Sequence, residues 1–138
     1  MPKLEEEVQT EEAEELQQIL LVNSPEQEEN RVRMLSLCGE VEEERAGELC
    51  YGMVALKEMG RRDSLEDPED IDSDIVTTFD PFTFNISTYG GSAVEMFAIY
   101  DTMRMVRQEC EIHTFGLGKV MSAGVLLLAA GTKGKRKI

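Results

Sequence analysis

Residues 82–103 read FTFNISTYGGSAVEMFAIYDTM, a segment in which two structural periods follow each other. Apolar and polar residues alternate over residues 82–87, as expected for a strand with one buried face. The Gly90-Gly91 pair then interrupts the alternation, and Ser92-Ala93-Val94-Glu95 matches the capping box that opens many helices. The segment therefore predicts a strand that passes through a glycine turn into a helix. Spacing of three and four residues predicts a buried helical stripe at Ala93, Met96, Phe97, Tyr100 and Met103.

Similar strand and helix pairs flank this unit on both sides. The predicted elements are a strand at Arg31 to Leu37, a helix at Glu42 to Met59 with Gly60 as its C-cap, a strand at Glu111 to Phe115, a turn at Gly116 and Gly118, and a helix at Ser122 to Ala130. The last helix is apolar on nearly every side, which predicts that it is buried. Alternation of strands and helices predicts an α/β domain with a largely parallel sheet.

Acidic segments lie outside these elements. Residues 1–30 are rich in glutamate and are predicted to be a helical extension, with an amphipathic helix at 4–21. The α/β domain then spans residues 31–138. Within it, residues 61–74 are rich in Asp, Glu, Ser and Pro, and this composition predicts an exposed acidic loop.

Overall charge and cysteine content exclude several function classes. The net charge is −14, with 28 acidic and 14 basic residues, so nucleic acid and membrane surfaces are not expected partners. Three cysteines without a C-x-x-C pair favour a reducing compartment, which we interpret as the cytoplasm, and they are predicted to be buried rather than catalytic. The N-terminus has no signal-peptide pattern, and the longest apolar run, residues 125–130, is too short to span a bilayer.

Ser122 is the candidate nucleophile from its position between a strand and a buried helix. That position exposes a hydroxyl beside unpaired backbone N–H groups in several unrelated hydrolases. The alternative is that Ser122 only caps the helix, and, taken as isolated observations, Ser122 favours such a cap and Gly90-Gly91 favours a simple tight turn.

Two blocks of sequence resemble a known family. Residues 118–136 read GKVMSAGVLLLAAGTKGKR, which is similar to the nucleophile segment of Clp protease proteolytic subunits (ClpP) in its glycine four residues before the serine and in its L-L-x-A-G-x-K-G-K-R ending. Gly90-Gly91-Ser92, followed by residues 98–103, is similar to the family's glycine turn and the helix after it. The resemblance extends from about Arg33 to the end of the chain.

This resemblance implies a crotonase-like, ClpP-like α/β fold, a superhelix of ββα units, and a serine endopeptidase activity. Carried over by position, Ser122 is the nucleophile, the N–H groups of Gly90 and Ala123 form the oxyanion hole, and Gly91 and Ser92 line the substrate groove. The family needs no metal or other cofactor. Its subunits form closed homo-oligomeric or mixed rings, and a hexameric AAA+ unfoldase feeds them unfolded polypeptides.

The sequence also departs from the family pattern. Tyr89 stands where the family's N-S-P-G-G turn has proline, which predicts an altered groove. The family's catalytic histidine and aspartate come later than the last residue of this chain, so we expect a C-terminally truncated or divergent form that is inactive on its own. His113 precedes Ser122 and matches no catalytic position, so it is predicted to be structural.

Two alternatives follow from these departures. One is a non-catalytic ring subunit that is kept for assembly or for docking a partner. The other is a crotonase-fold enzyme that uses the same two turns to hold the oxygen of an acyl thioester, although the L-L-x-A-G-x-K-G-K-R block argues against it.

Overall fold

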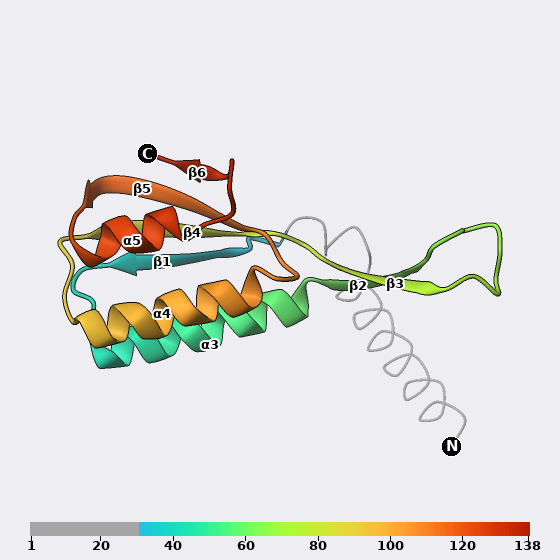
Figure 1. The fold of residues 1–138 in the computed structure, drawn as a ribbon, viewed down its shortest axis with the longest axis horizontal. Coiled ribbons are helices and arrows are strands. Elements are labelled where there is room, and N and C mark those ends of the chain that lie inside the picture. The colour runs from blue at the N-terminus through green and yellow to red at the C-terminus, as the bar shows by residue number, and fades with distance from the viewer. Residues whose placement is uncertain (1–30) are drawn as a thin grey trace, which may run out of the picture. The chain divides into compact units, whose positions relative to one another are not determined.

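A computed structural model describes residues 31–138 of the chain (Figure 1). The predicted helix at residues 4–21 lies outside the described residues. The described elements are β1 (Met34–Cys38), α3 (Glu43–Met59), β2 (Arg61–Leu65), β3 (Ile75–Phe79), β4 (Phe82–Thr88), α4 (Ala93–Val106), β5 (Ile112–Val120), α5 (Ala123–Ala129) and β6 (Arg136–Lys137).

Four of the strands form one parallel sheet in the order β1-β4-β5-β6. Leu37 pairs with Ile86 across β1 and β4, and Ile86 pairs with Gly116 across β4 and β5. Helices connect the successive strands, as a parallel sheet requires. The predicted α/β fold with a largely parallel sheet is confirmed.

The hydrophobic core lies between one face of this sheet and the helices. Phe82, Phe84, Ile86 and Thr88 alternate along β4 and are all buried, while the residues between them are partly exposed. In Figure 1, α3 and α4 lie side by side, and α5 contacts α4, β4 and β5. The alternation of apolar and polar residues therefore correctly predicted which face of β4 is buried.

β5 differs from its prediction in length. It was predicted to end at Phe115, but it continues through Gly116 and Gly118 to Val120. Its register with β4 shifts, so that Ile86 pairs with Gly116 while Thr88 pairs with Val120. Glycines inside a strand often mark such an irregularity, and here they extend the strand rather than end it.

The acidic segment at 61–74 is only in part a loop. Its first five residues form β2, which pairs antiparallel with β3, so Arg61 faces Phe79 and Leu65 faces Ile75. Residues 66–74 connect the two strands and are almost entirely exposed, as predicted. Figure 1 shows this hairpin projecting away from the four-stranded sheet. The strand was missed because residues 61–65 show no apolar alternation and gain their order from pairing with 75–79.

Several predicted burial patterns were wrong. α4 buries Ile99, Met103 and Val106, while Phe97 is 52% exposed. Val125 on α5 is 55% exposed, so this helix is buried on one side only. Both helices have apolar residues on more than one side, so the spacing of apolar residues alone does not reveal which side meets the sheet.

The cysteines have three different environments. Cys110 is buried, and this burial raises the pKa of its thiol, as expected for an inert core residue. Cys50 is partly buried, and Cys38 is exposed, which contradicts the prediction of a buried residue. Cys38 lies on the sheet face that the helices leave open, because its neighbour Leu37 points into the core.

No helix within residues 31–138 is long and apolar enough to cross a bilayer.

Candidate active site

Two turns, one after β4 and one after β5, meet at the same edge of the sheet. Gly90 in the first turn has a φ of 113°, and a Cβ placed on it would lie 2.7 Å from the Cβ and 3.1 Å from the Oγ of Ser122. The same Cβ would lie 3.4 Å from the backbone nitrogen of Ala123. Gly90 is therefore packed directly against Ser122 and Ala123, and only glycine fits there. The structure brings together the three residues that the sequence predicted to form the reacting centre.

Ser122 has an unusual backbone conformation. Its φ is 49° and its ψ is −119°, and it is the one non-glycine residue of the described chain with a positive φ. Residues other than glycine adopt such conformations rarely and at a cost of about 1–3 kcal/mol, and they concentrate at functional sites. The side chain of Ser122 makes no capping hydrogen bond to α5. Ser122 therefore occupies the N-cap position of α5, but the alternative that its hydroxyl caps the helix is wrong.

Hydrogen bonds on both sides of Ser122 hold this conformation. The Met121 N–H donates to the carbonyl of Thr88 at 3.0 Å, and the Val125 N–H donates to the carbonyl of Ser122 at 3.0 Å. Gly124 packs against Thr88, since a Cβ on Gly124 would lie 2.7 Å from the Thr88 Cγ2. The turn is thus fixed by the end of β4 and by the first turn of α5, which leaves the Ser122 hydroxyl on the exposed side.

Backbone donors lie around this hydroxyl. Ala123 is the first residue of α5, and its N–H has no acceptor among residues 31–138, as expected for the first turn of a helix. The Gly90 N–H, by contrast, donates to the Thr88 Oγ1 at 3.0 Å. Thr88 was not predicted to belong to the site, and its buried hydroxyl also donates to the carbonyl of Gly39. A threonine two residues before a glycine turn was the only available signal.

The next residue, Gly91, presents its backbone to the opposite side. Val41 bridges to Gly91 in parallel fashion, accepting from the Ser92 N–H at 2.8 Å and donating to the Gly90 carbonyl at 2.9 Å. In such a bridge, the N–H and C=O of Gly91 itself point away from Val41. Ser92 is exposed and its Oγ accepts from the Glu95 N–H at 3.4 Å, so the predicted cap of α4 is confirmed.

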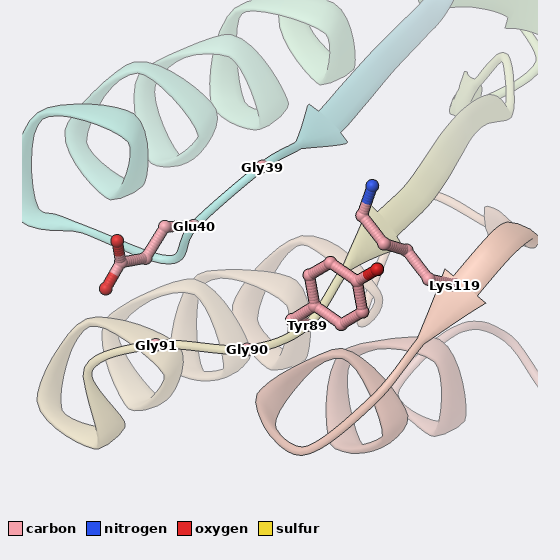
Figure 2. A pocket seen from close by; sticks show the side chains of 6 residues that line it. All are labelled: Gly39, Glu40, Tyr89, Gly90, Gly91 and Lys119. Atoms are coloured by element: carbon pink, nitrogen blue, oxygen red, sulfur yellow. The ribbon is translucent and has the colours of Figure 1, made fainter.

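A cavity of about 490 Å³ opens beside the glycine turn (Figure 2). Its lining residues are Gly39, Glu40, Tyr89, Gly90, Gly91 and Lys119. The Lys119 Nζ lies 5.0 Å from the centre of the Tyr89 ring. The aromatic replacement at Tyr89 is evident in the sequence, but its contact with Lys119 was not predicted, because it depends on the extension of β5 that brings Lys119 next to Tyr89.

The single histidine is remote from Ser122. His113 pairs with Thr83 and Val120 pairs with Thr88, five residues further along β4, so His113 lies about 17 Å at the usual rise per residue from the end of β5 that precedes Ser122. Its Nε2 lies 2.8 Å from the Glu111 carboxylate, and this hydrogen bond lowers the pKa of Glu111. No side-chain base within residues 31–138 is hydrogen-bonded to the Ser122 Oγ.

Comparison with known proteins identifies the family. The family model for Clp protease matches residues 73–138. The chain is 40% identical over 110 residues to an ATP-dependent Clp protease proteolytic subunit 1 of Corynebacterium jeikeium, which covers 77% of this chain and 46% of that relative. Part of this chain is a Clp protease domain.

Two further similarities agree with this assignment. A proteolytic subunit 2 of Nocardia farcinica is 39% identical over 110 residues, covering 77% of this chain and 43% of the relative. The crystal structure of the ClpP protease catalytic domain from Plasmodium falciparum matches with a TM-score of 0.59 and 26% identity, over 75% of this chain and 48% of that one. The Clp protease domain thus adopts the fold of that catalytic domain. The chain spans about half the length of the curated relatives that it matches.

Proposed function

We propose that this Clp protease domain belongs to a serine endopeptidase with Ser122 as its nucleophile. The observation that carries the proposal is the convergence of Gly90, Ser122 and Ala123, with Ser122 strained and its hydroxyl outside the helix cap. The Ser122 Oγ attacks the carbonyl carbon of a peptide bond and loses its proton to a base. The base passes this proton to the leaving amine as the peptide C–N bond breaks, which leaves an acyl-enzyme that water hydrolyses.

The oxyanion of the tetrahedral intermediate lies, in this proposal, between the N–H groups of Ala123 and Gly90. The free N–H of Ala123 supports its role directly. The Gly90 N–H donates to the Thr88 hydroxyl in this structure. In this proposal, that hydrogen bond breaks when the intermediate forms, and the N–H donates instead to the oxyanion, which is the stronger acceptor because it is charged. Loss of one such donor typically slows the chemical step by about 100- to 1000-fold.

The substrate binds, we propose, as an added strand along Gly91 and Ser92. Support comes from the direction of the Gly91 N–H and C=O, which point away from Val41 and remain available to another chain. Main-chain hydrogen bonds of this kind bind an extended polypeptide with little dependence on its sequence. Such binding suits unfolded polypeptides as substrates.

Assembly into a homo-oligomeric or mixed ring, fed by a hexameric AAA+ unfoldase, is the remaining part of the proposal. Large apolar side chains that stay exposed on three helices are consistent with an oligomer, in which neighbouring subunits would cover them. These side chains include Tyr51, Phe97 and Val125. The odd number of cysteines supports a reducing compartment such as the cytoplasm.

A second candidate function is a non-catalytic ring subunit. The lack of any base hydrogen-bonded to the Ser122 Oγ within residues 31–138, together with a single histidine that is held by Glu111, favours it. Under this proposal the chain on its own is inactive, because the hydroxyl keeps its proton.

Labelling with a fluorophosphonate, together with hydrolysis of a fluorescent unfolded protein, separates the two candidates. We expect labelling and hydrolysis from a longer product of the same gene that contributes a base, and little of either from the 138-residue chain, while Ser122→Ala in the active form is expected to abolish both labelling and hydrolysis. Ser64→Ala removes a matched hydroxyl on the exposed strand β2 and is expected to change neither signal. If neither labelling nor hydrolysis is detected for any form of the protein, this result would contradict the endopeptidase proposal and favour the non-catalytic subunit.

A further inference from the structure

The positively charged side chain of Lys119 lines the cavity beside the glycine turn. Thr88 pairs with Val120, and both side chains point toward the helices, so Tyr89 and Lys119 meet on the other side of the sheet. The cavity that they line also includes Gly90, which contacts Ser122, and Gly91, which lines the proposed groove. Anything that fills this cavity therefore lies next to a polypeptide in the groove.

The Lys119 ammonium group has no carboxylate partner in the described part of the chain. Lys57, for comparison, is paired with Glu58 and Glu109. Lys119 is partly buried and its Nζ lies over the Tyr89 ring at 5.0 Å, a contact that holds the cation without consuming its N–H donors. Figure 2 shows the Glu40 carboxylate, which also belongs to the lining, directed away from both Tyr89 and Lys119.

Resting on the proposed function, we propose that Lys119, held by Tyr89, binds a carboxylate of the polypeptide substrate in this cavity. The carboxylate belongs either to an Asp or Glu side chain or to the substrate's free C-terminus, which present the same group to the ammonium. A volume of about 490 Å³ accommodates either of them. The cavity thus gives an acidic protein of net charge −14 one local site that attracts acidic residues.

Binding of fluorescent peptides to the Ser122→Ala variant tests this without requiring turnover. The peptides are identical ten-residue chains with Glu, Gln or Lys at one position, scanned along the sequence, and each is made with a free or an amidated C-terminus. At the position that reaches the cavity, we expect the Glu peptide to bind about fivefold more tightly than the Gln peptide, as for a partly exposed ion pair. If the bound carboxylate is the substrate's C-terminus, we expect instead that the peptide with a free C-terminus binds about fivefold more tightly than the amidated peptide.

Variants of Lys119 assign the preference to this residue. Lys119→Gln is expected to remove it, and Lys119→Glu is expected to favour the Lys peptide. Lys133→Gln makes the same charge change at an exposed position outside the cavity and is expected to preserve the preference.

Equal binding of Glu and Gln peptides at every position, with no effect of the C-terminal carboxylate, would overturn the inference while leaving the endopeptidase intact. An equal loss of preference in Lys133→Gln would also overturn it, since the effect would then come from the overall field. If no peptide binds and neither the chain nor any longer product of the same gene is labelled by fluorophosphonate, the proposed function and this inference fail together.

Discussion

The turns after β4 and β5 both lead from a strand into a helix, and each contains one serine that the structure uses differently. In the first turn, Gly90 and Gly91 adopt the positive φ angles, while Ser92 keeps an ordinary extended backbone and caps α4 through its hydroxyl. In the second turn, the positive φ falls on Ser122 itself, whose hydroxyl caps nothing. The same residue type thus stabilises one helix and remains available for chemistry at the other.

The difference shows where conformational strain is held. Glycines adopt the left-handed conformation of the first turn without steric cost, so no other contact has to enforce it. A serine adopts a comparable conformation only because its neighbours fix it, here through the Met121 bond to Thr88 and the packing of Gly124. Strain that is maintained at a hydroxyl next to the free N–H of Ala123 is better explained by function than by stability.

Gly91→Ala should have the largest effect on the first turn. Gly91 has a φ of 154°, and a Cβ there would lie 2.3 Å from the carbonyl oxygen of Val41, which cannot move without breaking the bridge. We expect the free energy of unfolding to fall by at least about 3 kcal/mol, measured by urea denaturation. Gly47→Ala, on the exposed side of α3 with open space around it, is the matched control and should not destabilise. A Gly91→Ala loss of less than about 1 kcal/mol would mean that this turn is not constrained as described.

Thr88→Val tests the residue that joins the two turns. Valine matches the shape of threonine, but it leaves the Gly90 N–H and the Gly39 carbonyl without the buried hydroxyl. We expect a destabilisation of about 2 kcal/mol in the same assay. Thr102→Val, which removes a hydroxyl bonded to the Ala98 carbonyl on the partly exposed part of α4, should cost much less. Equal losses at the two sites would show that Thr88 has no special role.

The two serines themselves should respond differently to alanine. Ser92→Ala removes a helix cap and is expected to cost about 1 kcal/mol. Ser122→Ala removes no capping bond and should change stability by less than roughly 0.5 kcal/mol. Paired urea denaturation curves measure both, and a Ser122→Ala loss as large as that of Ser92→Ala would mean that the Ser122 hydroxyl is structural after all.

Ser122→Gly should give a small gain in stability. Glycine relieves a strain of about 1–3 kcal/mol at this φ but loses more backbone entropy on folding, by about 0.5–1 kcal/mol. We expect a net stabilisation of about 1 kcal/mol, the middle of the range that these two contributions allow, seen as a higher urea midpoint with an unchanged denaturant slope. Ser36→Gly, on an exposed strand position with ordinary backbone, should destabilise instead. Destabilisation by Ser122→Gly would contradict a strained serine.

Much of the site was predictable because it follows local sequence signals. The period of two over residues 82–87 placed β4 and its buried face, and Ser92 to Glu95 placed the start of α4. The order of strands and helices gave the parallel sheet, whose turns after β4 and β5 necessarily open at one edge. The resemblance of two short blocks to Clp proteases then pointed to Ser122, Gly90 and Ala123 as one group.

Features that depend on pairing between distant segments were missed. β2 and β3 stabilise each other although neither has a clear strand pattern, and the extension of β5 beyond Gly116 depends on its register with β4. Exposure of Phe97, Val125 and Cys38 was also missed, because a helix or strand with apolar residues on more than one side does not reveal which side meets the core.

By itself, the sequence determined the α/β class and the strand-to-helix turn after β4, since each depends on periodicity, capping and glycine at neighbouring positions, while the resemblance to Clp proteases indicated which residues of the two turns meet. Only the tertiary structure decided the backbone conformation of Ser122, the hydrogen bond that occupies the Gly90 N–H, and the contact of Lys119 with Tyr89. These three features arise where β4 and β5 pair out of regular register, and register is fixed by packing between segments that lie far apart in the chain.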